Sequence, residues 1–409
     1  MPGRPGNNVL MLTSTLPRWR GDSTPGFVLD LAANLVELGW PIDLLAPGCM
    51  GAASVERMEG TTIHRFPYMI PSSMQTLCYD GGIMPNIRSN RGKSVLVPPF
   101  IVSAIIATRR LISRLKPALI HAHWIVPMGF VAALAAPRSI PLAVTNHGSD
   151  VLDLGGSILN RLKSRVLARA DIITCNGSIT EAAVANLVPP GTRITRIPMG
   201  AKSADSGTDH GFSLPENRFI ILFAGRLFRG KGLDDLLDAM AEFGSGMRPF
   251  LLVAGTGPDE ARFKMRADDL GLAADIGFLG GLDHTRLLAL MQDVNAVVVP
   301  TRNTEWIEAQ GLVIAEAMLA GAPTIATLSG GAEDHVQDSK TGLLVAPGDP
   351  AAIRSALARL IDDRPAARAI GQAGRQYALE NLTCKASAQA FHELYSQGHE
   401  IAARRSTPA

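Results

Sequence analysis

The chain has 409 residues, of which 46% are hydrophobic and 19% charged, and its formal net charge is +2 at pH 7. This length is too great for one core and fits two domains of roughly 200 residues. The near-neutral charge argues against an extended nucleic-acid surface, so no nucleic-acid partner is expected. The four cysteines lie far apart and form no CxxC pair, so neither a zinc site nor a disulfide framework is indicated.

Strands and helices alternate through the first half of the chain. Several strand candidates are apolar throughout, which is typical of parallel strands covered on both faces. The predicted strands are 9–13, 42–46, 119–122, 142–145, 172–175 and 194–197. Between them, apolar residues at spacings of three and four predict helices that include 27–38 and 158–170.

A second series of the same kind follows. Its predicted strands are 219–224, 251–254, 276–279, 296–299, 324–326 and 343–345, and its helices include 233–243. Repeated βα units predict an α/β protein with two Rossmann-like, doubly wound parallel-sheet domains.

An aperiodic stretch rich in Ser, Asp and Gly separates the two series and predicts the domain boundaries. We interpret 201–216 as the linker between a first domain (1–200) and a second domain (217–384). The last stretch, 385–409, is helical and is a candidate to cross back to the first domain.

The region 88–116 combines an apolar run with basic flanks. The run 95–107 is interrupted by Pro98-Pro99 and is too short to span a bilayer. Two interpretations stay open: a helix lying on an anionic membrane surface, or a core helix with a solvated basic end. No signal peptide is apparent, so a cytoplasmic location is expected, with 88–116 as the candidate for peripheral membrane contact.

The second domain begins with a basic loop directly after its first strand. Gly225, Arg226 and Lys231 lie in the sequence GRLFRGKG, at the carboxyl end of that strand, where ligands bind in open α/β sheets. Arg and Lys there predict phosphate binding, although the Walker pattern is missing. The later loop 255–258 (GTGP) lacks the third glycine of a dinucleotide fingerprint and predicts a tight turn, which disfavours a nicotinamide enzyme.

The stretch 308–321 (EAQGLVIAEAMLAG) predicts a loop followed by a helix that starts near Gly311-Leu312. Such a helix start offers free amides and a positive dipole end to an anion. Glu308 and Glu316 flank that start, and because carboxylates repel phosphate, we expect them to accept hydrogen bonds from hydroxyls. Phosphates together with many hydroxyls indicate a nucleotide-sugar.

In the first domain, polar residues also follow predicted strands. Gly21 lies in a loop after the first strand, where its amide could approach a ligand. His121 and His123 would share one face of a strand, but no third ligand at metal spacing accompanies them, so no metal site is expected. His147, beside Gly148 at a strand end, is the most site-like of the three histidines.

The arrangement resembles a retaining nucleotide-sugar glycosyltransferase of the GT-B type, family 4. The segments that carry the resemblance are 121–124 (HAHW), 146–150 (NHGSD), 225–232 (GRLFRGKG), 255–258 (GTGP), the Glu-x7-Glu pattern of 308–316, and 329–333 (SGGAE). They follow the family's order over most of residues 9 to 385. A single glycine at position 21 stands where many members have a pair.

The resemblance implies a role for each candidate residue. Arg226 and Lys231 would hold the diphosphate of the donor, with Gly225 in the same loop. Glu316 would bind the ribose hydroxyls. Glu308, with the amides of Gly311 and Leu312, would hold the transferred sugar, and His147 would touch that sugar near its reacting carbon. Gly21 would meet the diphosphate from the first domain.

The same resemblance implies transfer with retention of configuration, without a metal or any other cofactor. The expected acceptor is a glycan or a lipid-linked glycan, in envelope or exopolysaccharide synthesis. Alternatives are a nucleotide-sugar epimerase of the same fold, a glycoside hydrolase using two carboxylates, and a non-catalytic sugar-binding protein. The donor base (UDP, GDP or ADP) and the sugar are not identified by the sequence.

Overall fold

The computed structural model describes residues 7–22, 24–79, 81–204, 207–244, 246–303 and 307–406, with side chains as far as Gln397. The chain forms two compact units. Unit 1 comprises Met1–Met199 together with Cys384–Ala409, and unit 2 is Gly200–Thr383. The first unit is therefore assembled from both ends of the chain.

Unit 1 contains an eight-stranded sheet in the order β3-β4-β2-β1-β5-β6-β7-β8, in which only the β3–β4 pair is antiparallel. Its strands are β1 (Val9–Leu12), β2 (Ile42–Pro47), β3 (Val55–Met58), β4 (Thr61–Phe66), β5 (Leu119–His123), β6 (Leu142–Asn146), β7 (Ile172–Cys175) and β8 (Thr195–Arg196). The six predicted strands are confirmed, each to within one residue at either end. The sequence analysis missed β3 and β4, because β3 is a largely exposed edge strand and charged residues interrupt the apolar run of β4.

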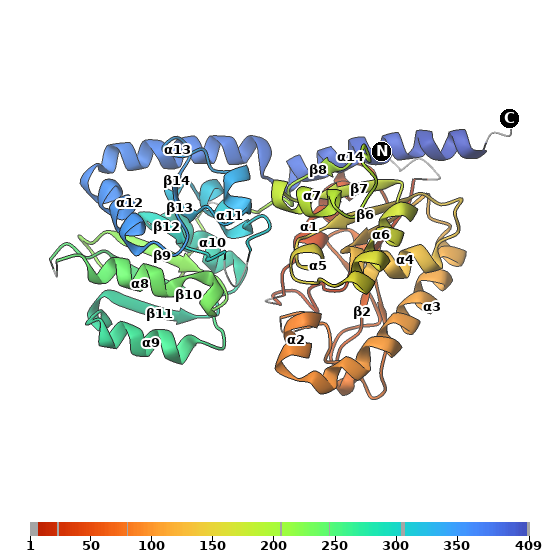
Figure 1. The fold of residues 1–409 in the computed structure, drawn as a ribbon, viewed down its shortest axis with the longest axis horizontal. Helices are drawn as coiled ribbons and strands as arrows, with labels where there is room; N and C mark the ends of the chain where they lie inside the picture. Colours follow the sequence, from red (N-terminus) through yellow and green to blue (C-terminus); the bar gives the residue numbers. More distant parts are fainter. Residues whose placement is uncertain are drawn as a thin grey trace. The chain divides into compact units, whose positions relative to one another are not determined.

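Helices cover both faces of this sheet (Figure 1). They are α1 (Phe27–Glu37), α2 (Ile83–Ser89), α3 (Val97–Leu115), α4 (Phe130–Ala135), α5 (Ser149–Leu152), α6 (Ser157–Arg169), α7 (Ser178–Ala185) and α14 (Cys384–Ser406). On one face Ile120 and Ala122 of β5 join a core with Phe100 of α3 and Val166 of α6. The opposite face is covered by α1 and α14, which pack against each other.

Unit 2 contains a fully parallel six-stranded sheet in the order β11-β10-β9-β12-β13-β14. The strands are β9 (Ile220–Ala224), β10 (Phe250–Ala254), β11 (Ile276–Gly280), β12 (Ala296–Val299), β13 (Thr324–Thr327) and β14 (Leu343–Val345). All six were predicted, again to within one residue at either end. Side chains of β9 alternate between two cores, with Ile221 and Phe223 in one and Leu222 and Ala224 in the other.

The two cores of unit 2 correspond to two helical layers. Helices α8 (Leu233–Ala241), α9 (Glu260–Asp269) and α12 (Pro350–Asp362) contribute to the first, while α10 (His284–Asp293), α11 (Leu312–Ala320) and α13 (Arg364–Asn381) contribute to the second. Both units are thus doubly wound α/β sheets, as the repeated βα pattern predicts.

The predicted linker 201–216 makes specific contacts within unit 2, with positions 205–206 outside the described residues. The amide of Ala201 donates to the carbonyl of Leu382 over 2.8 Å. Further along, Arg286 of α10 donates to the carbonyl of His210 and its guanidinium lies over the ring of Phe212, 4.8 Å from the ring centroid. The later part of this stretch is therefore packed on α10.

Helix α14 is held on unit 1 by buried polar contacts. The hydroxyl of Tyr395 lies 2.6 Å from Nδ1 of His121, whose Nε2 lies 2.6 Å from the hydroxyl of Thr145. Trp40, at the end of α1, donates to Nδ1 of His392 over 2.9 Å. Tyr395 and His121 are fully buried, so this contact has no water to replace it.

Replacing Tyr395 by Phe should lower the free energy of unfolding by about 1–3 kcal/mol, because Nδ1 of His121 would be left buried without a partner. Denaturant unfolding followed by circular dichroism measures this. The matched control is Tyr377→Phe, since that half-buried hydroxyl makes only a 3.3 Å hydrogen bond to the carbonyl of Asp334. Equal losses in the two variants would contradict a special role for the Tyr395 contact.

Candidate functional site

The predicted basic loop and the predicted helix start meet at the topological switch point of unit 2. Strands β9 and β12 are neighbours in the sheet. From β9 the chain continues to β10 on one side, and from β12 it continues to β13 on the other side. In open α/β sheets this is the place where ligands bind. The loop 225–232 follows β9, and the loop 300–311 follows β12.

Glycines allow these loops to pack backbone against backbone. A Cβ atom on Gly232 would lie 1.8 Å from the carbonyl oxygen of Pro300, and φ of Gly232 is +73°. A Cβ on Gly255 would lie 1.9 Å from the carbonyl oxygen of Gly225, and one on Gly257 would lie 2.2 Å from that of Leu227. The turn in this region covers Pro258 and Asp259, later than the predicted 255–258, and Gly255 and Gly257 support the basic loop.

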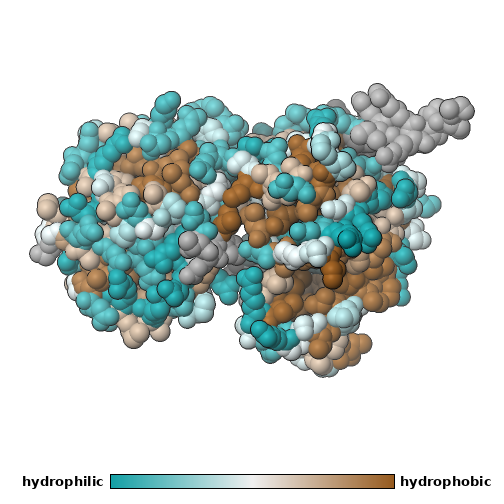
Figure 2. Space-filling view, viewed as in Figure 1, coloured by the Kyte–Doolittle hydropathy of each residue, from teal (hydrophilic) through white to brown (hydrophobic). Residues whose placement is uncertain are grey.

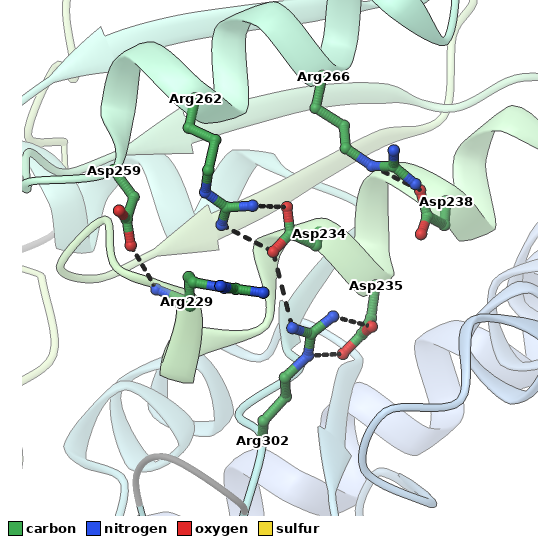
Figure 3. Close-up of polar contacts among 8 residues, drawn as sticks. All are labelled: Arg229, Asp234, Asp235, Asp238, Asp259, Arg262, Arg266 and Arg302. Carbon is green, nitrogen blue, oxygen red and sulfur yellow. Dashed lines mark hydrogen bonds and ion pairs between the residues drawn. The ribbon is translucent and has the colours of Figure 1, made fainter.

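A network of arginines and aspartates holds the basic loop from behind (Figure 3). Arg302 donates from Nε to Asp235 over 2.7 Å, and its amide donates to the carbonyl of Gly230 over 2.9 Å. Arg262 makes a bidentate pair with Asp234 at 2.8 and 3.0 Å. Both aspartates are buried in the first turn of α8, where the helix dipole favours negative charge.

The sequence analysis missed this network. Asp234 and Asp235 open a helix and Arg302 lies in a loop, so each alone reads as an ordinary surface charge. The feature of the sequence that could have indicated this network is the pair Asp234-Asp235, which closely follows the basic loop.

Within the basic loop, Lys231 and Arg226 have different surroundings. The ammonium group of Lys231 forms an ion pair with Glu308, and both side chains are largely buried. Arg226 is exposed and makes no ion pair with any residue that the structure describes. The sequence analysis gave Lys231 to phosphate and Glu308 to sugar. The structure brings these two side chains into direct contact.

The start of α11 is shaped by two further glycine contacts. Gly311 is the N-cap with φ +75°, and it has no side chain to cap the first amides of the helix, among them that of Leu312. The amide of Gly331 donates to the carbonyl of Glu308 over 2.7 Å. A Cβ on Gly331 would lie 2.5 Å from Cα of Gln310, so the loop after β13 supports the loop that carries Glu308.

Glu316 is buried on α11 and contacts a residue that the sequence analysis did not select. Nε2 of His284, the first residue of α10, lies 2.8 Å from a carboxylate oxygen of Glu316. Glu308 faces Lys231 while Glu316 faces His284, so the two carboxylates have separate partners. In the sequence, His284 could have been selected as a site residue only from its position shortly after the end of β11.

Gly21 belongs to unit 1, in the loop that follows β1. It has φ +81° and nothing within 4 Å of where a Cβ would lie. Arg18 holds the loop through a 2.7 Å ion pair with Asp22. Burial alone would raise the pKa of Asp22, but hydrogen bonds from Arg18 and Thr24 lower it to about 2.

His147 also belongs to unit 1 and lies among aromatic rings after β6. Its ring centroid is 5.1 Å from that of Phe27, 4.6 Å from that of Trp124 and 5.2 Å from that of His123. Nε2 of His147 lies 2.9 Å from Nδ1 of His123. Burial lowers the pKa of His147 and of His121 to about 3, and that of His123 well below its usual value.

The Asn146–Asp150 turn fixes the backbone around His147. Asp150 accepts from the amide of Ile125 over 2.6 Å and from the side chain of Asn146, which in turn accepts from the amide of Gly148 over 3.1 Å. Burial raises the pKa of Asp150 to about 6. Among the described residues, no group of three or more His, Cys, Asp or Glu side chains is placed to hold a metal ion.

Two family models match the chain. Glycosyl transferases group 1 matches residues 208–377, and the glycosyl transferase 4-like domain matches residues 27–200. Together they cover most of both units, although β1 and the loop that carries Gly21 lie before the first matched residue. The chain belongs to the family 4 glycosyltransferases of GT-B fold.

Particular relatives agree with this class. A GDP-mannose-dependent alpha-(1-6)-phosphatidylinositol monomannoside mannosyltransferase of Mycolicibacterium smegmatis is 30% identical over 287 residues, 67% of this chain and 74% of the relative. A D-inositol 3-phosphate glycosyltransferase of Corynebacterium jeikeium is 32% identical over 220 residues, which are 52% of this chain but only 51% of the relative.

Solved structures share the fold at lower identity. Sucrose-phosphate synthase from Thermosynechococcus elongatus has a TM-score of 0.78 and 22% identity, covering 97% of this chain and 100% of that one. HepE from Anabaena, solved with UDP-glucose, has a TM-score of 0.67 and 18% identity, covering 95% and 99%.

Replacing Gly232 by Ala should destabilise unit 2 by about 3 kcal/mol or more, because the new Cβ meets backbone that cannot rotate away and φ is positive. Thermal unfolding measures the loss. Gly244→Ala is the control, since its Cβ would meet only the end of the Met247 side chain, at 3.8 Å. A wild-type melting curve for Gly232→Ala would show that the loops are not packed as described.

Proposed function

We propose that this glycosyltransferase moves a sugar from a nucleotide diphosphate sugar to a glycan or lipid-linked acceptor, with retention of configuration and without a metal. The observation that carries the proposal is the junction of the basic loop with the start of α11: Arg226, Lys231 and uncapped helix amides lie at one switch point. HepE, which shares the fold, was solved with UDP-glucose, and this supports a nucleotide-sugar donor.

The charges of the basic loop match a donor diphosphate. Arg226 has no ion pair among the described residues, so its five donors are available to phosphate oxygens. Lys231 is held by Glu308, which fixes its ammonium group in place. Gly21 of unit 1, with its open surroundings, is proposed to offer its amide to the same diphosphate.

The acidic residues are proposed to bind hydroxyls. Glu308, with the amides of Gly311 and Leu312, would hold the transferred sugar, and His147 would contact that sugar near its reacting carbon. Glu316 would accept hydrogen bonds from the ribose. Its contact with His284 orients the carboxylate within an otherwise buried setting.

The proposed reaction keeps atoms and charge in balance. The bond between the anomeric carbon and the phosphate oxygen breaks, and the diphosphate leaves with the electron pair. The acceptor hydroxyl oxygen then bonds to the anomeric carbon on the same face, and its proton passes to the departing phosphate oxygen. Arg226, Lys231 and the positive end of α11 stabilise the charge that develops on the leaving group.

A donor screen tests the proposal first. Binding of a ligand to the folded state raises the melting temperature, so the full chain is heated with UDP-, GDP- and ADP-sugars in buffer without added metal. A donor that raises the melting temperature is then incubated with and without glycan acceptors. A transferred product supports the proposal, whereas an epimer, free sugar alone, or binding without turnover would favour an epimerase, a hydrolase or a sugar-binding protein.

Lys231→Ala should lower kcat by about 10²–10³-fold with the assigned donor, comparable to the loss of one preorganised oxyanion donor. Lys264→Ala is the matched control, because the ion pair of that lysine with Glu260 and its contact with the ring of Phe278 involve no residue of the basic loop. Initial rates at saturating donor decide the result. Full activity in the Lys231 variant would remove it from the mechanism.

We further propose that the 88–116 region contacts an anionic membrane surface. No Asp or Glu occurs between Asp80 and Asp150, while this stretch holds eight Lys and Arg residues, so the rest of the chain carries a net charge of −6. Along the outer face of α3 and the preceding turn, Val95, Val102 and Ile106 are 71%, 56% and 44% exposed. Figure 2 shows the hydrophobic surface that follows α3.

The composition and burial of α3 support this proposal. Arg91–Leu115 is long and apolar enough to cross a membrane by length and composition, but Phe100, Ala104, Thr108 and Leu111 face the core of unit 1. Pro98 and Pro99 lie in the first turn of α3, where proline is tolerated, so they start the helix and do not break it. A helix with one face in the protein core and an apolar, basic-edged outer face suits a bilayer surface.

Vesicle co-sedimentation tests this contact. The protein should bind vesicles containing phosphatidylglycerol and should not bind pure phosphatidylcholine, and Arg109→Gln with Arg110→Gln should weaken binding about tenfold or more. Arg368→Gln with Arg375→Gln, which removes two exposed charges from α13, is the control and should have no effect. Equal binding by both double variants would refute a docking role for α3.

A further inference from the structure

One hydrogen bond joins the rings of His123 and His147, in a contact between β5 and the loop after β6. Nδ1 of His123 and Nε2 of His147 are 2.9 Å apart, and the two rings are nearly parallel, at 16°. The shifts of their pKa values mean that both rings are neutral near pH 7. One of the two facing nitrogens must therefore carry a hydrogen and the other must accept it.

The remaining nitrogen of each ring decides which arrangement is favoured. Nε2 of His123 is buried and has no hydrogen-bond partner. If His147 were the donor, the proton of His123 would lie on this enclosed Nε2 as an orphaned N–H. If His123 is the donor, its Nε2 carries only a lone pair without a hydrogen-bond donor. Buried N–H groups without a partner are rarer than buried acceptors without one, so His123 is favoured as the donor.

The open side of the pair belongs to His147. Its Nδ1 makes no hydrogen bond to the described part of the chain, and it is not among the buried polar atoms that lack a partner. The residue as a whole is half-buried. With His123 as donor, His147 therefore presents an N–H group at its accessible nitrogen.

We propose that His123 is a positioning residue that fixes His147 with its proton on Nδ1, so that His147 meets the donor sugar as a neutral hydrogen-bond donor and not as a base. The sugar contact rests on the proposed function, but the choice of tautomer does not. The surrounding rings of Phe27 and Trp124 hold the imidazole in one orientation. The role of His123 is the same as that of groups that orient metal-binding histidines from behind.

The test uses the full chain labelled with ¹⁵N-histidine and long-range ¹H–¹⁵N correlation spectra at pH 7, which distinguish the two neutral tautomers. The signals of His147 are assigned by their loss in His147→Gln. We expect the proton on Nδ1 in the wild type and in His123→Asn, because the amide nitrogen of Asn can replace Nδ1 of His123 as donor. In His123→Met, whose thioether sulfur can accept a hydrogen bond but cannot donate one, the proton should move to Nε2.

His121→Phe is the matched control. His121 lies on the same face of β5 and is equally buried, but its nitrogens face Tyr395 and Thr145. Its replacement should leave the tautomer of His147 unchanged. A proton on Nε2 in the wild type would overturn the inference, even if His123→Met fails to fold. An unchanged tautomer in a folded His123→Met would overturn it as well.

Activity separates this inference from the proposed function. With the assigned donor, His123→Met should lower kcat roughly tenfold, the lower end for loss of an orienting partner, and His123→Asn should keep most of the wild-type value. A changed tautomer with wild-type kcat would overturn the role of His147 as a donor to the sugar. If the wild type transfers no sugar from any donor, the proposed function fails while the spectra still decide the tautomer.

Discussion

The candidate site of unit 2 depends on one backbone contact, between Gly232 and the carbonyl of Pro300. It brings the loops after β9 and β12 together at the switch point of the sheet, and Arg226, Lys231 and Glu308 all lie on these loops. Lys231 precedes the contact by one residue, and Arg302 follows it by two and holds Asp235. A side chain at position 232 would separate the loops, so the charge arrangement follows from a requirement for glycine.

The polar groups of this unit fall into two sets with different roles. Asp234, Asp235, Arg262 and Arg302 neutralise one another behind the basic loop (Figure 3) and need no ligand. Arg226 lacks such a partner among the described residues. Lys231 is paired with Glu308, an acidic partner that a diphosphate can replace. Because the two aspartates and two arginines of the first set neutralise one another, the positive charge that a ligand can meet is carried by Arg226 and Lys231.

The sequence predicts the frame of this molecule well, because buried parallel strands are short apolar runs and glycines mark the loops after them. It predicts less where a residue depends on partners far along the chain. Arg302 and His284 act through contacts with Asp235 and Glu316, and neither contact has a local pattern. Likewise, His123 looks like half of a metal pair in the sequence, whereas in the structure its partner is the ring of His147. Strands β3 and β4 were missed because polar residues interrupt their apolar pattern.

The membership of α14 in unit 1 has a consequence for biosynthesis. Residues 1–199 leave the ribosome long before α14 is made, so the sheet face that carries His121 lacks one of its two covering helices while unit 2 is translated. Domains generally fold as units in order of synthesis, but here the amino-terminal one is completed last. An enzyme shortened at its carboxyl terminus would thus lose part of its first domain and leave its second intact.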